Sequence, residues 1–203
     1  AGPIERSTSL LPQFKKNYYF DYHRITAGMR LMVWGFFKKL VVADNAGVIV
    51  DRVYNNYLDY DGSILIFSTV LFAFQILADF SGYSDIAIGS AMILGFKLRR
   101  NFNQPYLATS ISDFWHRWHI SLSTWFRDYL YIPIGGNRVV RWRWYYNLLI
   151  TFFLSGVWHG ANWTFLCWGL LHGLFFIVAD INKMIKTKLH TVISFDYIKN
   201  IMN

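Results

Sequence analysis

Residues 144–179 read WYYNLLITFFLSGVWHGANWTFLCWGLLHGLFFIVA, and this stretch decides the fold because no charged side chain occurs between Arg143 and Asp180. As one straight α-helix it would be about 54 Å long, at about 1.5 Å per residue. The hydrocarbon core of a bilayer is only about 30 Å thick. The stretch is too long for one span and too apolar for a soluble loop. We therefore expect membrane-embedded helices, interrupted at Ser155–Gly156 and at Gly160–Ala161–Asn162.

A second apolar region, residues 64–96, carries two carboxylates in its middle, at Asp79 and Asp85. Irregular backbone at membrane depth persists only where protein or a wet cavity surrounds it. We therefore expect a helix that is broken between these residues and faces the protein interior. The carboxylates either accept backbone N–H groups where the helix restarts, which we favour because Asp is a good N-cap residue, or form a proton relay.

The composition is that of an integral membrane protein. Charged residues make up 16% of the 203 residues and hydrophobic residues 54%, whereas a soluble domain has about 25% charged residues. Nine Trp and 13 Tyr fit anchors at a lipid surface. The net charge of +8 does not indicate nucleic acid, because the basic residues flank apolar runs, as cytoplasmic loops do. These flanks are Lys38–Lys39, Lys97/Arg99/Arg100, Arg138/Arg141/Arg143 and Lys183/Lys186/Lys188.

The N-terminal part of the chain predicts less regular membrane structure. Residues 1–24 are polar and aromatic and predict a loop or an interfacial segment. Residues 25–42 have a helical pattern, but the charges of Arg30 and Lys38–Lys39 favour a tilted or surface-lying helix. Residues 44–57 predict a second, short helix. Because the chain opens without a signal peptide, we expect residues 1–203 to be an internal fragment of one larger membrane domain.

Residues 110–131 predict a single amphipathic helix at the membrane interface. Ser110 followed by Asp113 resembles a capping box. Pro133 and the two glycines after it should end the helix near Tyr131. Aromatic residues supply its apolar contacts, so the helix belongs at the interface rather than across the membrane.

His116 and His119 lie three residues apart, and therefore within one turn of this helix. A metal site needs a third and a fourth ligand, and none accompanies this pair, so we predict no metal ion. His116 is expected to be half solvated at the interface. His119 has apolar neighbours in the sequence and is expected to point toward the protein interior.

His159 lies between small residues, Gly156 on one side and Gly160 and Ala161 on the other, that would let a substrate or another backbone approach closely. Its imidazole could take a proton from an attacking hydroxyl and return one to a leaving group. It could equally be a core histidine that is satisfied by a carbonyl freed at the helix break. His172 lies in mid-helix, where a hydrogen-bonded core histidine is the favoured interpretation.

Five stretches together resemble the membrane-bound O-acyltransferase family, in its bacterial polysaccharide branch, with members that acetylate alginate and members that transfer D-alanine to teichoic acid. They follow one another in family order from Ala1 to Gly173. The stretches are AGPIERSTSLLPQF (1–14), FFKKLVVADN (36–45), FQILADFSGYSDIAIGSAMILGF (74–96), FNQPYLATSISDFWHRWHISLSTWFRDYLYIPIGGNR (102–138) and SGVWHGANWTFLCWGLLHG (155–173).

The resemblance implies an all-α, multi-spanning membrane protein whose broken and interfacial helices surround a tunnel, in the inner membrane of a bacterium. It assigns His159, in Trp158-His159-Gly160, as the catalytic residue and general base. It assigns His119, in Trp118-His119-Ile120-Ser121-Leu122-Ser123, as a second functional histidine. Further candidates for contacts with the tunnel or the substrate are Trp158, Asn162, Trp115 and Arg127.

The resemblance also implies the reaction. A cytoplasmic thioester, acetyl-CoA, would give its acyl group toward the hydroxyls of an exported polysaccharide, directly or through a periplasmic partner protein, and no bound cofactor would be needed. D-alanyl transfer is an alternative within the family. A proton-coupled transporter using Asp79, Asp85 and His159 is an alternative outside it, and a membrane scaffold with dispensable histidines is a third class.

Overall fold

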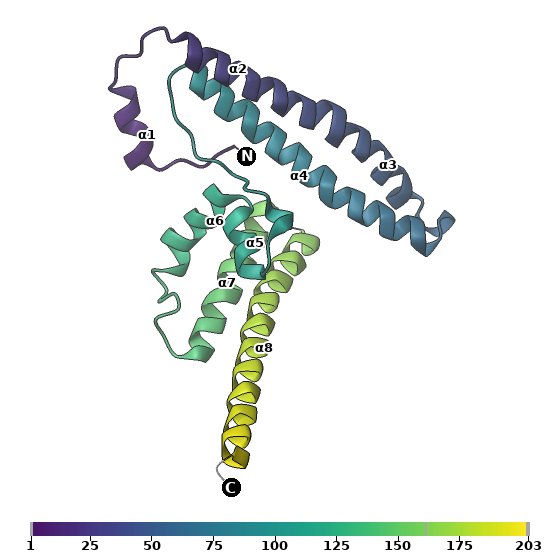
Figure 1. Ribbon diagram of the computed structural model, residues 1–203. Coiled ribbons are helices and arrows are strands. Elements are labelled where there is room, and N and C mark those ends of the chain that lie inside the picture. The colour runs from purple at the N-terminus through teal and green to yellow at the C-terminus, as the bar shows by residue number, and fades with distance from the viewer. Residues whose placement is uncertain (1, 161, 202–203) are drawn as a thin grey trace. The chain divides into compact units, whose positions relative to one another are not determined.

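A computed structural model describes residues 2–160 and 162–201, with side chains as far as Lys188, and within these ranges every regular element is helical. The chain divides into two compact units. The first unit is Ala1–Asn103 with Trp118–Leu122, and the second is Gln104–Arg117 with Ser123–Asn203. The α-helices are α1 (Ser7–Phe14), α2 (Tyr22–Phe36), α3 (Asp44–Asn55), α4 (Gly62–Ile93), α5 (Ile111–Arg117), α6 (Ile120–Phe126), α7 (Arg141–His159) and α8 (Trp163–Ile201) (Figure 1). Short elements are the π-helices η1 (Phe37–Ala43) and η4 (Arg127–Tyr131) and the 3-10 helices η2 (Tyr57–Asp59) and η3 (Pro105–Leu107).

The first unit is built on the antiparallel pair α2 and α4, which lie side by side (Figure 1). Glycines seven residues apart on each helix meet in this contact. A Cβ added to Gly28 would lie 2.7 Å from the carbonyl oxygen of Gly89, and one added to Gly35 would lie 2.7 Å from that of Gly82. Small residues let two backbones approach this closely, as they do in many membrane helix pairs.

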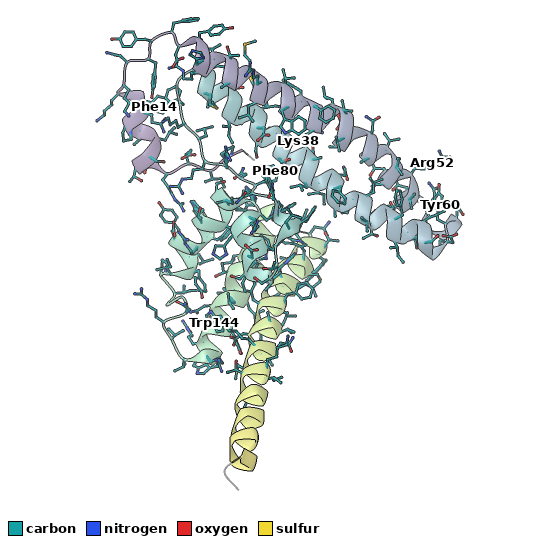
Figure 2. All side chains as sticks on the ribbon, in the orientation of Figure 1. Phe14, Lys38, Arg52, Tyr60, Phe80 and Trp144 are labelled. Atoms are coloured by element: carbon teal, nitrogen blue, oxygen red, sulfur yellow. The ribbon has the colours of Figure 1, made fainter. Side chains whose placement is uncertain are left out.

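The expected break in residues 64–96 is wrong, because α4 is one continuous helix of 32 residues through Asp79 and Asp85. The two carboxylates form ion pairs instead of capping a restarted helix. Lys38 Nζ lies 2.7 Å from Asp85 Oδ2 and 3.1 Å from Ser81 Oγ, and Lys38 is labelled in Figure 2. Lys39 Nζ lies 2.8 Å from Asp79 Oδ1. An ion pair stabilises the charge of each carboxylate, so no helix break is needed to supply backbone N–H groups.

The π-helix η1 supplies both lysines and continues α2 directly, so the predicted helix at 25–42 exists but is wound more loosely at its end. The predicted short helix at 44–57 is confirmed as α3. This helix packs on α4 and contains the buried residues Val50 and Val53. Hydrogen bonds to Asp44, and then to Asp79, raise the pKa of Lys39. Lys39 therefore stays charged.

Residues 1–24 are not wholly a loop, which corrects the prediction, because they contain α1. Pro12 lies inside this helix, and the helix ends two residues after it, at Phe14. A proline beyond the first turn removes one backbone hydrogen bond and crowds the preceding turn. The presence of Pro12 is consistent with the short length of α1.

In the second unit the predicted break after His159 is confirmed, since α7 ends at His159 and α8 begins at Trp163. The break predicted at Ser155–Gly156 is wrong, because both residues are buried within α7. A Cβ on Gly156 would collide with the carbonyl oxygen of Phe165. This glycine therefore serves the contact between α7 and α8 and does not interrupt the helix. Ala161 lies outside the described residues.

The single helix expected at 110–131 is also wrong, since α5 stops at Arg117 and α6 starts at Ile120. The predicted start and end of this helical region agree with the structure. The amide of Asp113 donates to Ser110 Oγ at 3.1 Å, as a capping box requires, and the last π-helical residue is Tyr131. The hydrogen bond from Arg117 holds the pKa of the Asp113 carboxyl below its usual value.

Within the described part of the chain, two helical segments are long and apolar enough to cross a membrane by length and composition, Gly62–Ile93 and Trp163–Lys188. Most of the residues on these segments are not buried within the chain itself. The apolar surface is therefore available to lipid or to other protein.

We expect Gly82→Ala to destabilise the first unit, because the new Cβ would lie 2.7 Å from the carbonyl oxygen of Gly35. Overpacking of this kind costs about 1–3 kcal/mol. Gly62→Ala is the matched control, since nothing lies within 4 Å of a Cβ at that position of the same helix. Thermal unfolding of the detergent-purified protein should show a lower Tm for Gly82→Ala only. Equal Tm values would contradict the close contact.

Candidate active site

His119 is the most constrained of the predicted site residues. Its φ is 40°, in the left-handed region, and only one other non-glycine residue of the described chain, Gln104, shares this feature. A non-glycine residue pays about 1–2 kcal/mol for this conformation. Such strain is concentrated at functional sites, so the outlier itself marks the position.

His119 is only 3% exposed, so it is buried in the protein interior as expected. Its ring meets Phe80 of α4 edge to face, with 4.5 Å between ring centroids, and Phe80 is labelled in Figure 2. Phe80 also meets the ring of Phe102, at 5.1 Å. The imidazole thus packs on an aromatic ring of α4, the longest described helix of the first unit.

The backbone after His119 is held by Asn101, which the sequence analysis missed. The amide of Ile120 donates to the main-chain oxygen of Asn101 at 2.9 Å. The amide of Ser121 donates to Asn101 Oδ1 at 3.4 Å. Asn101 sits in a basic connection with no chemical motif of its own, so only the fold reveals it.

His159 is the last residue of α7 and lies in the second unit. Its side chain is exposed in this chain. Three rings surround it, with centroid distances of 5.0 Å to Trp158, 5.9 Å to Phe165 and 5.2 Å to Trp168. A histidine at a helix end with an open side can reach a reacting group, as a general base must.

Gly160 is required after His159 for a reason that the sequence did not show. Its φ of 153° disfavours other residues, and a Cβ would lie 3.2 Å from the ring of Phe165. The missing side chains of Gly156 and Gly160 thus make room for the chain's own Phe165. The expectation that they open space for another backbone holds at Gly156, and close approach of a substrate stays a prediction.

The remaining candidates have more ordinary environments. Asn162 Oδ1 accepts from the amide of Thr164 at 3.2 Å, so Asn162 caps the start of α8. Arg127 is exposed, and its Nε lies 2.9 Å from Asp128 Oδ1. Trp158 is 48% exposed beside His159. Of these three, only Trp158 lies against a predicted catalytic ring.

Trp115 belongs to an aromatic cluster that reaches His159. Its ring lies 5.8 Å from Trp168, which in turn touches His159, and 5.0 Å from His172. Three helices of the second unit, α5, α7 and α8, contribute to this cluster through Trp115, Phe152 and Trp168. The structure therefore brings Trp115, Trp158 and His159 into one aromatic environment.

His172 does not have the hydrogen bond expected of a core histidine. Its Nδ1 and the Nε1 of Trp115 are both buried, and neither has a hydrogen-bond partner among the described side chains and backbone. Each such buried group costs about 1–3 kcal/mol. These two nitrogens are buried polar atoms within a cluster of aromatic rings.

His116 is exposed, and its Nδ1 lies 2.6 Å from the carbonyl oxygen of Ser112 within α5. It lies in the second unit, whereas His119 lies in the first. The two histidines of the His-x-x-His pair therefore have different surroundings. Among the described residues no group of three or more His, Cys, Asp or Glu side chains is arranged to hold a metal ion.

Comparison with known proteins agrees with these motifs. The chain is 45% identical over 176 residues to a peptidoglycan O-acetyltransferase of Helicobacter pylori, covering 86% of this chain and 33% of that protein. It is 44% identical over 173 residues to a probable alginate O-acetylase, AlgI, of Azotobacter vinelandii, covering 85% and 34%. A teichoic acid D-alanyltransferase of Bacillus subtilis is 30% identical over 190 residues, covering 86% and 46%.

The chain thus spans between a third and a half of the length of these curated relatives. A model of the membrane-bound O-acyltransferase family matches residues 1–197, which include both histidine motifs. Since the match runs through both compact units and nearly the whole sequence, the chain belongs to the membrane-bound O-acyltransferase family.

Proposed function

We propose that this chain is the histidine-bearing part of an enzyme that moves an acetyl group from a thioester toward hydroxyls of an exported polysaccharide. The proposal rests on the position of His159. This residue ends α7, its imidazole is exposed, and aromatic rings pack beside it. Two relatives named as acetyl-transferring enzymes are 44–45% identical, against 30% for the D-alanyltransferase. That difference favours acetyl over D-alanyl transfer.

In the proposed reaction His159 takes the proton of the acceptor hydroxyl as its oxygen attacks the thioester carbonyl. The carbon–sulfur bond then breaks, and the departing thiolate recovers the proton from His159. No redox change occurs, and no bound cofactor is consumed. Acetyl-CoA is the proposed cytoplasmic donor, and the acceptor is the polysaccharide or a partner protein that carries the acetyl group onward.

His119 is proposed to orient or polarise the thioester carbonyl. Its fixed backbone and the Phe80 contact suit a group that must not move during the reaction. Trp115 and Trp158 are proposed as walls of the substrate path, because both lie in the aromatic environment of His159. Asn162 and Arg127 are proposed as weaker substrate contacts, since each already has a hydrogen bond within the chain.

We further propose that residues 1–203 are an internal piece of one multi-spanning domain in a bacterial inner membrane, with helices around a tunnel. The family match across both units supports a single domain. The two apolar helical segments support membrane insertion. The ion pairs of Asp79 and Asp85 support a structural rather than a transport role for these carboxylates.

We expect His159→Ala to lower acetylation of the exported polymer by about 100-fold or more, since a general base contributes about that much. Protein abundance should stay normal, because the side chain is exposed and ends a helix. His116→Ala is the matched control and should stay largely active. The assay is the O-acetyl content of the polymer, normalised to membrane-inserted protein. Near-normal acetylation in the His159 variant would remove the central assignment.

His119→Gly should separate catalysis from folding. Glycine adopts a φ of 40° without the backbone strain present at His119, so thermal stability should be retained. Acetylation should fall as severely as in His119→Ala, because both variants lack the imidazole. Tm and polymer acetyl content, measured on the same preparations, test this. An active His119→Gly variant would assign the residue a backbone role only.

His172→Phe should keep acetylation and leave Tm unchanged or higher. The substitution keeps a ring against Trp115 and Trp168 but removes a buried nitrogen that has no partner among the described groups. Replacing such an atom with carbon is neutral or stabilising by about 1 kcal/mol. Loss of acetylation at normal Tm would show that His172 takes part in the reaction, against the packing role expected for it.

A further inference from the structure

We infer that Asn101 is a positioning residue for His119, which rests on the proposed role of His119 in acyl transfer. Asn101 is 1% exposed and lies in the connection between α4 and η3. Its side chain and main chain bond to two segments that lie far apart in the sequence, Ser84 of α4 and the start of α6, and Ser121 extends the network to Ile4. Nothing in its sequence neighbourhood marks it for chemistry, so the inference comes from these contacts alone.

The first contacts fix the restart of the helix after His119. The opening N–H groups of any α-helix lack partners within the helix. At α6 the amide of Ile120 finds the Asn101 main-chain oxygen at 2.9 Å, and the amide of Ser121 finds Asn101 Oδ1 at 3.4 Å. Asn is a good capping residue, and here it caps from outside the helix. The left-handed turn at His119 ends directly on this cap.

The second set of contacts secures the cap itself. Ser121 Oγ donates to Asn101 Oδ1 at 2.5 Å and accepts from the amide of Ile4 at 2.9 Å. Asn101 Nδ2 donates to Ser84 Oγ at 3.1 Å. Asn101, Ser121 and Ser84 are each 2% exposed or less. A fully bonded buried network is rigid, because each member would lose a partner if another moved.

The third observation connects the network to the ring of His119. Ser84, which holds Asn101, lies four residues after Phe80, which meets the His119 ring at 4.5 Å. Residues four apart share one face of a helix. One face of α4 therefore fixes the backbone beside His119 through Asn101 and its imidazole through Phe80. The neighbouring Phe102 continues this alignment, since its ring lies 5.1 Å from both Phe80 and Trp118.

The consequence for the reaction follows from geometry. A left-handed histidine has ordinary backbone conformations of lower energy available, so it keeps its position only while its surroundings hold it. Without Asn101 the turn can relax and carry the imidazole away from the thioester. A displacement of about 1 Å at a catalytic group can cost about 100-fold in rate.

The test uses the full-length protein in detergent, with acetyl-CoA as the probe donor and thiol release as the rate. Asn101→Ala should lower kcat by about 30-fold to 100-fold, with KM for acetyl-CoA changed by less than about twofold. Asn101→Asp should recover most of the rate, because a carboxylate can accept from both serine hydroxyls and from the Ser121 amide. Ser121→Ala should fall between them and serves in place of Asn101→Ala if that variant does not accumulate.

Asn147→Ala is the matched control for a buried asparagine. Asn147 is 0% exposed and donates through Nδ2 to the Gly136 oxygen at 3.0 Å, in the second unit. It should lose stability while keeping its rate per folded molecule. If Asn101→Ala also keeps its rate per folded molecule and only lowers Tm, the residue is structural and the inference is overturned.

A double-mutant cycle separates this inference from the proposed function. In the His119→Gly background, adding Asn101→Ala should change the residual rate by less than about twofold, because there is no imidazole left to position. An equal fold-loss in both backgrounds would overturn the inference. If His119→Gly alone keeps the normal rate, the proposed role of His119 fails first. If His119→Gly is inactive while Asn101→Ala is fully active, only the positioning role fails.

Discussion

The close contact between α2 and α4 is the constraint on which the rest of the first unit depends. Gly28 and Gly35 bring the two backbones close enough for η1, which follows α2, to run along α4. That approach places Lys38 within 2.7 Å of Asp85. With its carboxylates paired, α4 stays helical past them and carries Phe80 and Ser84 on one continuous face. The glycine pairs Gly28–Gly89 and Gly35–Gly82 therefore influence, through α4, which residues surround His119.

This dependence explains where sequence reasoning succeeded. The break between α7 and α8 was predictable because its cause is local: a stretch longer than one span, with Gly160 and Asn162 at the point where the apolar pattern fails. The capping of α5 by Ser110 was predictable for the same reason. His159 could be singled out because both a local break and a family motif point to it.

The same dependence explains the errors. Asp79 and Asp85 suggest a helix break when only their neighbours are considered, and their lysine partners are 40 and 47 residues away. The interruption at His119 was missed because the amphipathic pattern of residues 110–131 runs on without a glycine or proline. The acceptors that allow the helix to restart come from Asn101, outside that segment. Pairings at long range are not visible in local periodicity.

The two family histidines are held by opposite means, and this difference fits different tasks. His119 is buried, and several contacts fix it. Its backbone is strained, its ring packs on Phe80, and the helix that begins at Ile120 is hydrogen-bonded to Asn101. His159 is exposed at a helix end, and the aromatic rings of Trp158 and Trp168 lie beside it. A group that polarises a carbonyl gains from preorganisation, because it need not reorganise as charge develops. A group that takes a proton from an incoming hydroxyl and gives it to a departing thiolate must be reachable from more than one direction. The arrangement therefore favours His159 as the proton carrier and His119 as the fixed partner, and the reverse assignment would put the strained backbone where freedom is needed.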